Sequence, residues 1–310
     1  MNGSDRRDEF RDEIRAQLGE ARAQFEATNA KIEAKAGRNL FLAVGTGLLF
    51  AGIFLASLFI FKQLYMLLVL VLMTIALLEL ATAFRVSGRR VPRIGAVIGG
   101  VVITVGAAFW GAQGMLLGLF GASLLLVVWR LIEGLVPRWE VPPRTLLRDV
   151  VSGLFTLVYV PFLGAFSILL VQAERGEWWV FALVLVVVSV DIGAYAAGVT
   201  LGRHKMTPRI SPNKTWEGFA GAAVLAVAAG IAISLLALGQ PWWVGVVLGL
   251  VVLLTATGGD LTESLIKRNL GIKDMSSWIP GHGGFLDRLD SLLPSAVGVY
   301  GVALALGVFA

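Results

Sequence analysis

Residues Ser264–Asp290 read SLIKRNLGIKDMSSWIPGHGGFLDRLD, and this polar stretch lies between two long apolar runs of the chain. It holds four basic residues, three aspartates and a histidine flanked by glycines. Ionised groups are costly inside a membrane and mark sites that act on charged species. In so apolar a chain, the stretch indicates a site at a membrane face that handles charged groups.

The composition of the whole chain sets its class. Of its 310 residues, 57% are hydrophobic, only 15% are charged and 37 are glycine, which is typical of a polytopic helical membrane protein. The absence of cysteine excludes disulfides, thiolate metal sites and a cysteine nucleophile. The opening residues are charged and polar, so we expect no cleavable signal peptide.

Apolar windows follow one another along the chain. A helix needs about 20 apolar residues to cross a membrane. Nine windows fit: Leu40–Phe61, Leu64–Phe84, Ile94–Ala112, Met115–Leu135, Val150–Val171, Trp178–Gly198, Phe219–Leu238, Trp242–Thr257 and Leu292–Ala310. The sequence therefore predicts an all-α, polytopic integral membrane protein of about nine transmembrane helices, with a close helical hairpin at GAQG between the third and fourth.

Basic residues alternate strongly between successive loops. The loops after even-numbered helices contain fifteen Lys and Arg residues, whereas the opposite loops contain Lys62 and Arg175 alone. The fifteen are Arg85, Arg89, Arg90, Arg93, Arg138, Arg144, Arg148, Arg203, Lys205, Arg209, Lys214, Lys267, Arg268, Lys273 and Arg288. Because such an excess lies on the cytoplasmic side, we expect the N-terminus and the polar site in the cytoplasm and the C-terminus outside, in the cytoplasmic membrane.

The first 38 residues differ from the rest. They carry eight basic and eight acidic side chains, and Phe10, Ile14, Leu18 and Phe25 fall on one helical stripe. We predict a cytoplasmic amphipathic helix, which is either a membrane-surface or partner-binding arm or a mostly solvated helix. The chain then divides into this arm (1–38), an N-terminal region of four transmembrane helices (39–149) and a C-terminal catalytic region of five (150–310).

Some acidic residues fall inside the predicted spans. Asp191 lies about thirteen residues into the sixth span, where an ionised carboxylate needs a polar cavity or a cation, unless it serves helix packing. Glu79, and Arg130 with Glu133, lie near cytoplasmic ends, so we expect them to snorkel to the interface.

Asp287 and Asp290 form a DxxD pair after GHGG. Their spacing of three places both carboxylates on one helical face, and Asp260 ends the preceding span. Hard oxygen ligands suit Mg²⁺, which is commonly completed by substrate phosphates, while glycines let backbone N–H groups approach an anion. The pattern predicts Asp260, Asp287 and Asp290 as metal ligands. His204 and His282 lack the further nitrogen or sulfur ligands of a zinc site.

The segment SPNKTWEG, Ser211–Gly218, combines a cation with hydroxyls and a helix-breaking proline, as a loop around an anionic ligand does. Lys214 is its expected phosphate contact. Lys267, Arg268, Lys273 and Arg288 are either further anion contacts or ordinary topogenic charges.

These motifs together resemble those of the phosphatidate cytidylyltransferases, or CDP-diacylglycerol synthases. The resemblance runs without a gap through Ser264–Asp290 and includes DIGAYAAGVTLGR, from Asp191, and SPNKTWEG. It extends from about Leu40 to the C-terminus and leaves the arm without an inherited function. The first four spans support it by hydropathy alone.

The resemblance implies transfer of a cytidylyl group from CTP to phosphatidic acid, yielding CDP-diacylglycerol and pyrophosphate with Mg²⁺, alone or with a second cation. It implies Asp260, Asp287, Asp290 and Lys214 as catalytic residues. At the substrates it places Asp191, Ser211, Asn213, Thr215, Ser264, Lys267, Arg268, Lys273, His282, Gly283, Gly284 and Arg288. It also implies membrane lipids as partners and a homodimer; no nucleic-acid partner is expected.

Two other classes of protein stay open. A CTP-dependent polyprenol or lipid kinase would release CDP rather than pyrophosphate. An ion-coupled transporter would line an ion path with its acids, but we find no repeated halves with broken helices in the sequence. A CDP-alcohol phosphotransferase is excluded because its DGxxAR core is absent.

Overall fold

A computed structural model describes residues 40–135, 142–272, 275–276 and 284–309. The predicted arm lies outside these residues, so its helix stays a prediction. The described chain falls into two compact units: Leu40–Leu55 belongs to the first, and the described residues from Ala56 onward form the second. Apart from the first part of helix α2 (Leu40–Ile60), the features discussed below lie in the second unit.

The structure is overwhelmingly helical. The helices are α2 (Leu40–Ile60), α3 (Lys62–Val86), α4 (Arg93–Leu135), α5 (Pro143–Leu157), α6 (Leu163–Gln172), α7 (Gly176–Leu201), α8 (Trp216–Ile233), α9 (Trp242–Leu270), α10 (Leu286–Leu289) and α11 (Leu292–Ala305). A π-helical turn around Pro161, η2 (Val158–Phe162), joins α5 to α6, and a second, η3 (Ser234–Leu238), extends α8. Helix α5 runs without a break through the expected domain boundary between residues 149 and 150.

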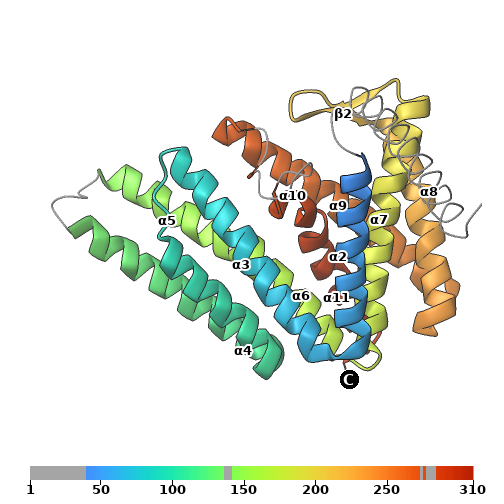
Figure 1. The fold of residues 1–310 in the computed structure, drawn as a ribbon, viewed down its shortest axis with the longest axis horizontal. Coiled ribbons are helices and arrows are strands. Elements are labelled where there is room, and N and C mark those ends of the chain that lie inside the picture. The colour runs from blue at the N-terminus through green and yellow to red at the C-terminus, as the bar shows by residue number, and fades with distance from the viewer. Residues whose placement is uncertain (1–39, 136–141, 273–274, 277–283, 310) are drawn as a thin grey trace, which may run out of the picture. The chain divides into compact units, whose positions relative to one another are not determined.

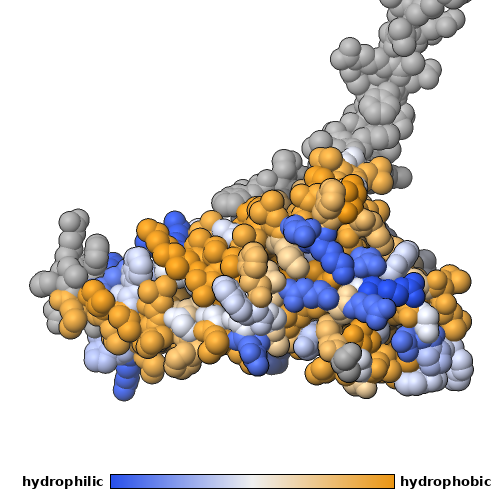
Figure 2. Space-filling view, turned by 90° about the horizontal axis from the view of Figure 1, so that it is seen from below, coloured by the Kyte–Doolittle hydropathy of each residue, from blue (hydrophilic) through white to orange (hydrophobic). Residues whose placement is uncertain are grey.

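Within the described residues, six helical segments are long and apolar enough to cross a membrane. They are Lys62–Val86, Arg93–Leu135, Pro143–Gln172, Gly176–Leu201, Trp216–Leu238 and Trp242–Leu270. The surface agrees with this role, because large apolar side chains are exposed along most helices and predominate on the face in Figure 2. The all-α polytopic class is confirmed, whereas the number of nine spans stays a prediction.

Helix α4 is two helices that turn back on each other. Gly111, with φ 60° and ψ −146°, breaks the helical backbone in a conformation that favours glycine. On either side the backbones touch: a Cβ on Gly106 would collide with the carbonyl of Gly114, and one on Gly118 would lie 3.0 Å from the Ile103 Cα. The hairpin predicted between the third and fourth spans is therefore confirmed, and small residues allow its close packing.

The helices from α6 onward pack in the same manner. Helices α7, α8 and α9 lie side by side, and α11 packs against α6, α7 and α9 (Figure 1). Gly230 of α8 and Gly245 of α9 are in backbone contact, as are Gly193 of α7 and Gly221 of α8. This close packing fixes the frame on which the polar residues stand.

The basic loops meet at one end of the second unit. Arg148 donates to the Gly88 carbonyl at 2.9 Å, Ser87 donates to the Leu270 carbonyl at 3.2 Å, and Arg268 donates to the Ile210 carbonyl at 3.4 Å. At the opposite end, Lys62 donates to the Ala173 carbonyl at 3.4 Å. The loop alternation inferred from charge is thus present in the fold, while the side that faces the cytoplasm stays a prediction.

Two residues expected to snorkel are buried instead. Arg130 is fully buried and donates to Asp149 of α5 through Nε and Nη2, at 3.2 and 2.8 Å. Glu79 of α3 is 2% exposed. The snorkelling interpretation was wrong for both, because segments distant in the sequence supply their buried partners.

Also unexpected is a short antiparallel hairpin, β1 (Lys205–Thr207) and β2 (Ser211–Thr215), between α7 and α8. Prolines 208 and 212 exclude an α-helix there. The sequence had indicated only a loop in this segment.

Replacing Gly106 by leucine should lower the melting temperature of the detergent-solubilised protein, because the new side chain must displace the Gly114 backbone. Overpacking of this kind typically costs about 1–3 kcal/mol. Gly121→Leu is the matched control, since a Cβ at Gly121 meets no atom within 4 Å. Equal melting temperatures for the two variants would contradict the close hairpin.

Candidate functional site

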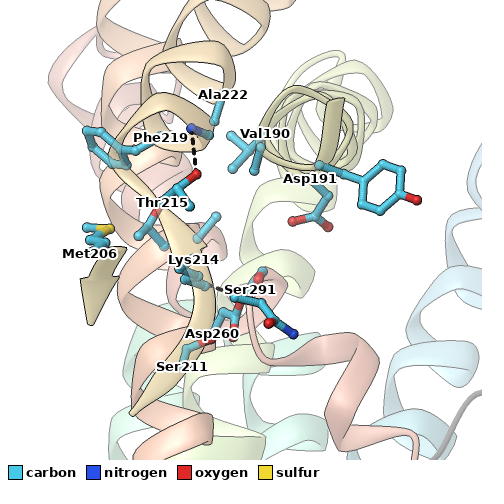
Figure 3. Close-up of a pocket in the computed structure, with 16 residues that line it drawn as sticks. Val190, Asp191, Met206, Ser211, Lys214, Thr215, Phe219, Ala222, Asp260 and Ser291 are labelled. Atoms are coloured by element: carbon cyan, nitrogen blue, oxygen red, sulfur yellow. Dashed lines mark hydrogen bonds and ion pairs between the residues drawn. The ribbon is translucent and has the colours of Figure 1, made fainter. Parts of the chain in front are cut away.

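A pocket of about 310 Å³ lies among α7, α8 and α9, beside strand β2 (Figure 3). Six residues predicted for the site line it: Asp191, Ser211, Asn213, Lys214, Thr215 and Asp260. Val190, Phe219, Ala222 and Ala256 form an apolar part of the wall. Such a pocket can hold a molecule with a strongly polar end and a less polar remainder.

The β-hairpin carries four of these residues, and local contacts tie it to α8. Thr215, in extended conformation, caps α8 by accepting a hydrogen bond from the Gly218 N–H at 3.1 Å. The Glu217 carboxylate accepts from the backbone N–H groups of Arg203 and His204, and lies 2.6 Å from His204 Nδ1. His204 therefore serves to hold the hairpin through its contact with Glu217. Among the described residues, no group of three or more His, Cys, Asp or Glu side chains is arranged to hold a metal ion.

An ion pair crosses the pocket. The ammonium of Lys214 on β2 lies 2.6 Å from the Asp260 carboxylate on α9 (Figure 3). Ser264, one helical turn further along α9, donates to Asp260 at 3.3 Å. Both charged side chains remain partly exposed, at 22% for Lys214 and 38% for Asp260. The pair is thus accessible to a ligand that brings its own charge.

Two further carboxylates lie near Asp260. Asp191 of α7 lines the same pocket, and Asp290, next to the pocket residue Ser291, is buried. Burial, followed by the negative charge of Asp260, raises the pKa of Asp290 to about 7. A bound cation or a proton would relieve this repulsion. Carboxylates that repel one another in this way are the electrostatic setting of a divalent-cation site.

A second polar cluster joins α9 to α10. The Lys267 ammonium lies 2.6 Å from Glu263 and 2.8 Å from Asp287. The other oxygen of Asp287 accepts from the backbone N–H groups of Gly284 and Met275, at 2.8 and 3.2 Å. Burial raises the pKa of Asp287. Hydrogen bonds with the side chains of Glu263 and Lys267 lower it by more, so the pKa of Asp287 is below its ordinary value.

The residues present suit a hard cation in their chemistry, since carboxylate oxygens are the donors that Mg²⁺ prefers. Asp260 lies close enough to Asp290 for its negative charge to raise the pKa of Asp290. Asp287, however, has both oxygens engaged by Lys267 and backbone groups. In the described part of the chain, no three acidic or histidine side chains are already arranged around a common point as a metal site.

The remaining predicted residues have separate places. Arg268 connects α9 to the hairpin through the Ile210 carbonyl, Gly284 packs against Asp287 and Glu79, and Arg288 is exposed on α10. Lys273, His282 and Gly283 lie outside the described residues, so their roles stay predictions.

Two residues of this region were missed by the sequence interpretation. Glu263 was given no role in the sequence analysis, although its spacing of four from Lys267 is that of a helical ion pair. Glu79 accepts hydrogen bonds from Ser276, Phe285 and Leu286, nearly two hundred residues or more away. No local pattern in the sequence signals that contact.

Fold and pocket define an integral membrane protein whose helical bundle holds a charged pocket at one end. The chain belongs to the cytidylyltransferase family, whose model matches residues 42–306.

Curated relatives cover most of the chain. The phosphatidate cytidylyltransferase of Mycobacterium bovis is 39% identical over 276 residues, which are 86% of this chain and 89% of the relative. That of Mycobacterium leprae is 39% identical over 272 residues, or 85% and 87% of the two chains. The Brucella suis enzyme of the same name is 42% identical over 144 residues, or 45% and 53%.

Removing the Thr215 hydroxyl should weaken the junction between the hairpin and α8. We expect Thr215→Ala to destabilise the protein by about 1 kcal/mol, the usual effect of losing a helix N-cap, and Thr215→Ser to retain most of the stability. Thermal unfolding in detergent measures both. An alanine variant as stable as the serine variant would rule out the capping role.

Proposed function

We propose that this protein is a phosphatidate cytidylyltransferase: it transfers the cytidylyl group of CTP to phosphatidic acid and releases pyrophosphate. The observation that carries this proposal is similarity along nearly the whole chain to enzymes of that name. The pocket supports it independently, because it presents a cation, hydroxyls and carboxylates to one space.

In this reaction a phosphate oxygen of phosphatidic acid attacks the α-phosphorus of CTP, and pyrophosphate leaves. A phosphate monoester is largely ionised at neutral pH, so the attacking oxygen needs no dedicated base. The main task is to bring two anions together and to stabilise the charge that develops. Lys214 is placed for this task, with Ser211, Asn213 and Thr215 as further contacts on the same hairpin.

We further propose that binding of the phosphates draws Lys214 away from Asp260. The two side chains now neutralise each other at 2.6 Å, and both are partly exposed. A phosphate group competes for the ammonium, which leaves the Asp260 carboxylate to a cation. Arg268 and Lys273 are proposed as additional phosphate contacts.

Asp260 and Asp290, with Asp191 or Asp287, are the residues that would hold Mg²⁺. Mg²⁺ would neutralise nucleotide phosphates and favour loss of pyrophosphate. Asp287 also orders the segment before α10 through its bonds to Gly284 and Met275. We place this site at the cytoplasmic face, in line with the distribution of basic loops, and the chain in a homodimer by family resemblance.

The decisive test uses purified protein with radiolabelled CTP, phosphatidic acid and Mg²⁺. We expect equal amounts of pyrophosphate and lipid-linked cytidine. Release of CDP with a phosphorylated polyprenol or other lipid alcohol as product would favour the lipid kinase instead. Failure to form either product with the well-folded protein would overturn the proposal.

Asp290→Asn should lower turnover by at least about a hundredfold, because it removes an acidic group from the place where we expect Mg²⁺ to bind. Turnover should be lost in the same way when excess chelator is added to the unaltered protein. Glu133→Gln makes the same chemical change on α4, where Glu133 contacts Trp129 and Arg130, and should remain active. An active Asp290→Asn protein, or full turnover in chelator, would remove the metal assignment.

A further inference from the structure

The Glu79 carboxylate reaches the segment that carries Asp287 and Asp290 from a different part of the chain. Glu79 lies on α3, is 2% exposed, and does not line the pocket. Its Oε1 accepts from the Phe285 N–H at 3.0 Å and from the Ser276 hydroxyl, and its Oε2 accepts from the Leu286 N–H at 2.8 Å. One buried carboxylate thus binds three donors of a single segment.

Two of those donors, the N–H groups of Phe285 and Leu286, lie at the start of α10, the short helix that contains Asp287. The first N–H groups of a helix have no partner within the helix, and a carboxylate placed there can accept hydrogen bonds from them. Hydrogen bonds to an ionised group are also stronger than neutral ones. Glu79 therefore acts on α10 as a capping side chain does, although it comes from another helix.

The neighbouring glycine shows how tightly the two elements fit. A Cβ on Gly284 would lie 2.9 Å from Oε2 of Glu79 and 3.0 Å from Oδ2 of Asp287. Gly284 and Met275 donate their N–H groups to Asp287, while Phe285 and Leu286 donate theirs to Glu79. Two carboxylates thus accept these four backbone N–H groups, two each.

We infer that Glu79 is a positioning residue: it fixes the start of α10 so that Asp287 and Asp290 are held in their working arrangement. The kinetic part of this inference rests on the proposed function; the structural part does not. Because Glu79 lies outside the pocket lining, its loss affects the rate of turnover and leaves substrate affinity nearly unchanged. Glu79→Gln keeps the size of the side chain but replaces one accepting oxygen by a donor NH₂ group, which cannot bind a backbone N–H.

Hydrogen exchange followed by mass spectrometry tests the structural part on the full-length protein in detergent. In Glu79→Gln, the remaining oxygen can still accept one of the two backbone N–H groups, so at least one of the amides of Phe285 and Leu286 should exchange at least about tenfold faster, the size expected for loss of a hydrogen bond to a charged group. Glu133→Gln, the same change on α4, should leave their exchange as in the unaltered protein. Unchanged exchange at Phe285 and Leu286 in Glu79→Gln would overturn the inference.

Kinetics then separates positioning from a purely structural role. We expect Glu79→Gln to lower kcat about tenfold or more while KM for CTP and for phosphatidic acid stays within about twofold, as for a residue that acts on transition-state groups alone. Glu79→Asp keeps the charge but has a shorter side chain, so its kcat should lie between those of Glu79→Gln and the unaltered protein. A normal kcat, or a loss explained by the unfolded fraction alone, would refute positioning.

If Glu79→Gln is not recovered in folded form, the same two measurements on Glu79→Asp decide the question: faster exchange and a lower kcat are expected again, to a smaller extent, and unchanged values would overturn the inference. Absence of cytidylyl transfer by the unaltered protein would refute the proposed function, but the exchange experiment would still judge the Glu79 contact. The two failures are therefore distinguishable.

Discussion

The ion pair between Lys214 and Asp260 is the contact around which the candidate site is arranged. It joins the β-hairpin to α9 across the pocket, at 2.6 Å, and places a cation directly beside a carboxylate. Buried or half-buried charges are tolerated where each has a partner, and exchange of partners is then a way to bind a charged ligand. The apolar helices serve to hold these few groups in register.

Pairing of charge extends beyond the pocket and shapes the whole polar end of the second unit. Lys267 lies between Glu263 and Asp287, and Arg130 donates a hydrogen bond to Asp149. Glu79 accepts a hydrogen bond from the backbone at the start of α10. Asp290 is the contrasting case, because burial raises its pKa and the acidic neighbours Asp260 and Asp191 raise it further. A local excess of negative charge next to the Lys214 cation is consistent with two kinds of ligand, one anionic and one cationic.

Much of this could be predicted from the sequence because the signals are local. The apolar windows predicted the helical class, and the GAQG sequence predicted the hairpin at Gly111. The motif around Lys214 predicted residues of the pocket wall. The partners of Glu79 and Arg130 could not be predicted, since they depend on packing between segments far apart in the chain. The β-hairpin escaped prediction because its strands are only three and five residues long and contain prolines or lie next to one. Whether Asp287 binds metal also depends on three-dimensional neighbours that compete for its oxygens.

The contact made by Glu79 has a consequence for biosynthesis. Its backbone partners follow it by 206 and 207 residues, so α3 is synthesised long before Phe285 and Leu286. Until the last part of the chain is inserted, the Glu79 carboxylate has to be stabilised in or near the lipid by water or by other groups. Completion of this end is thus a late event, and a chain truncated before Phe285 leaves the Glu79 carboxylate without these two backbone donors.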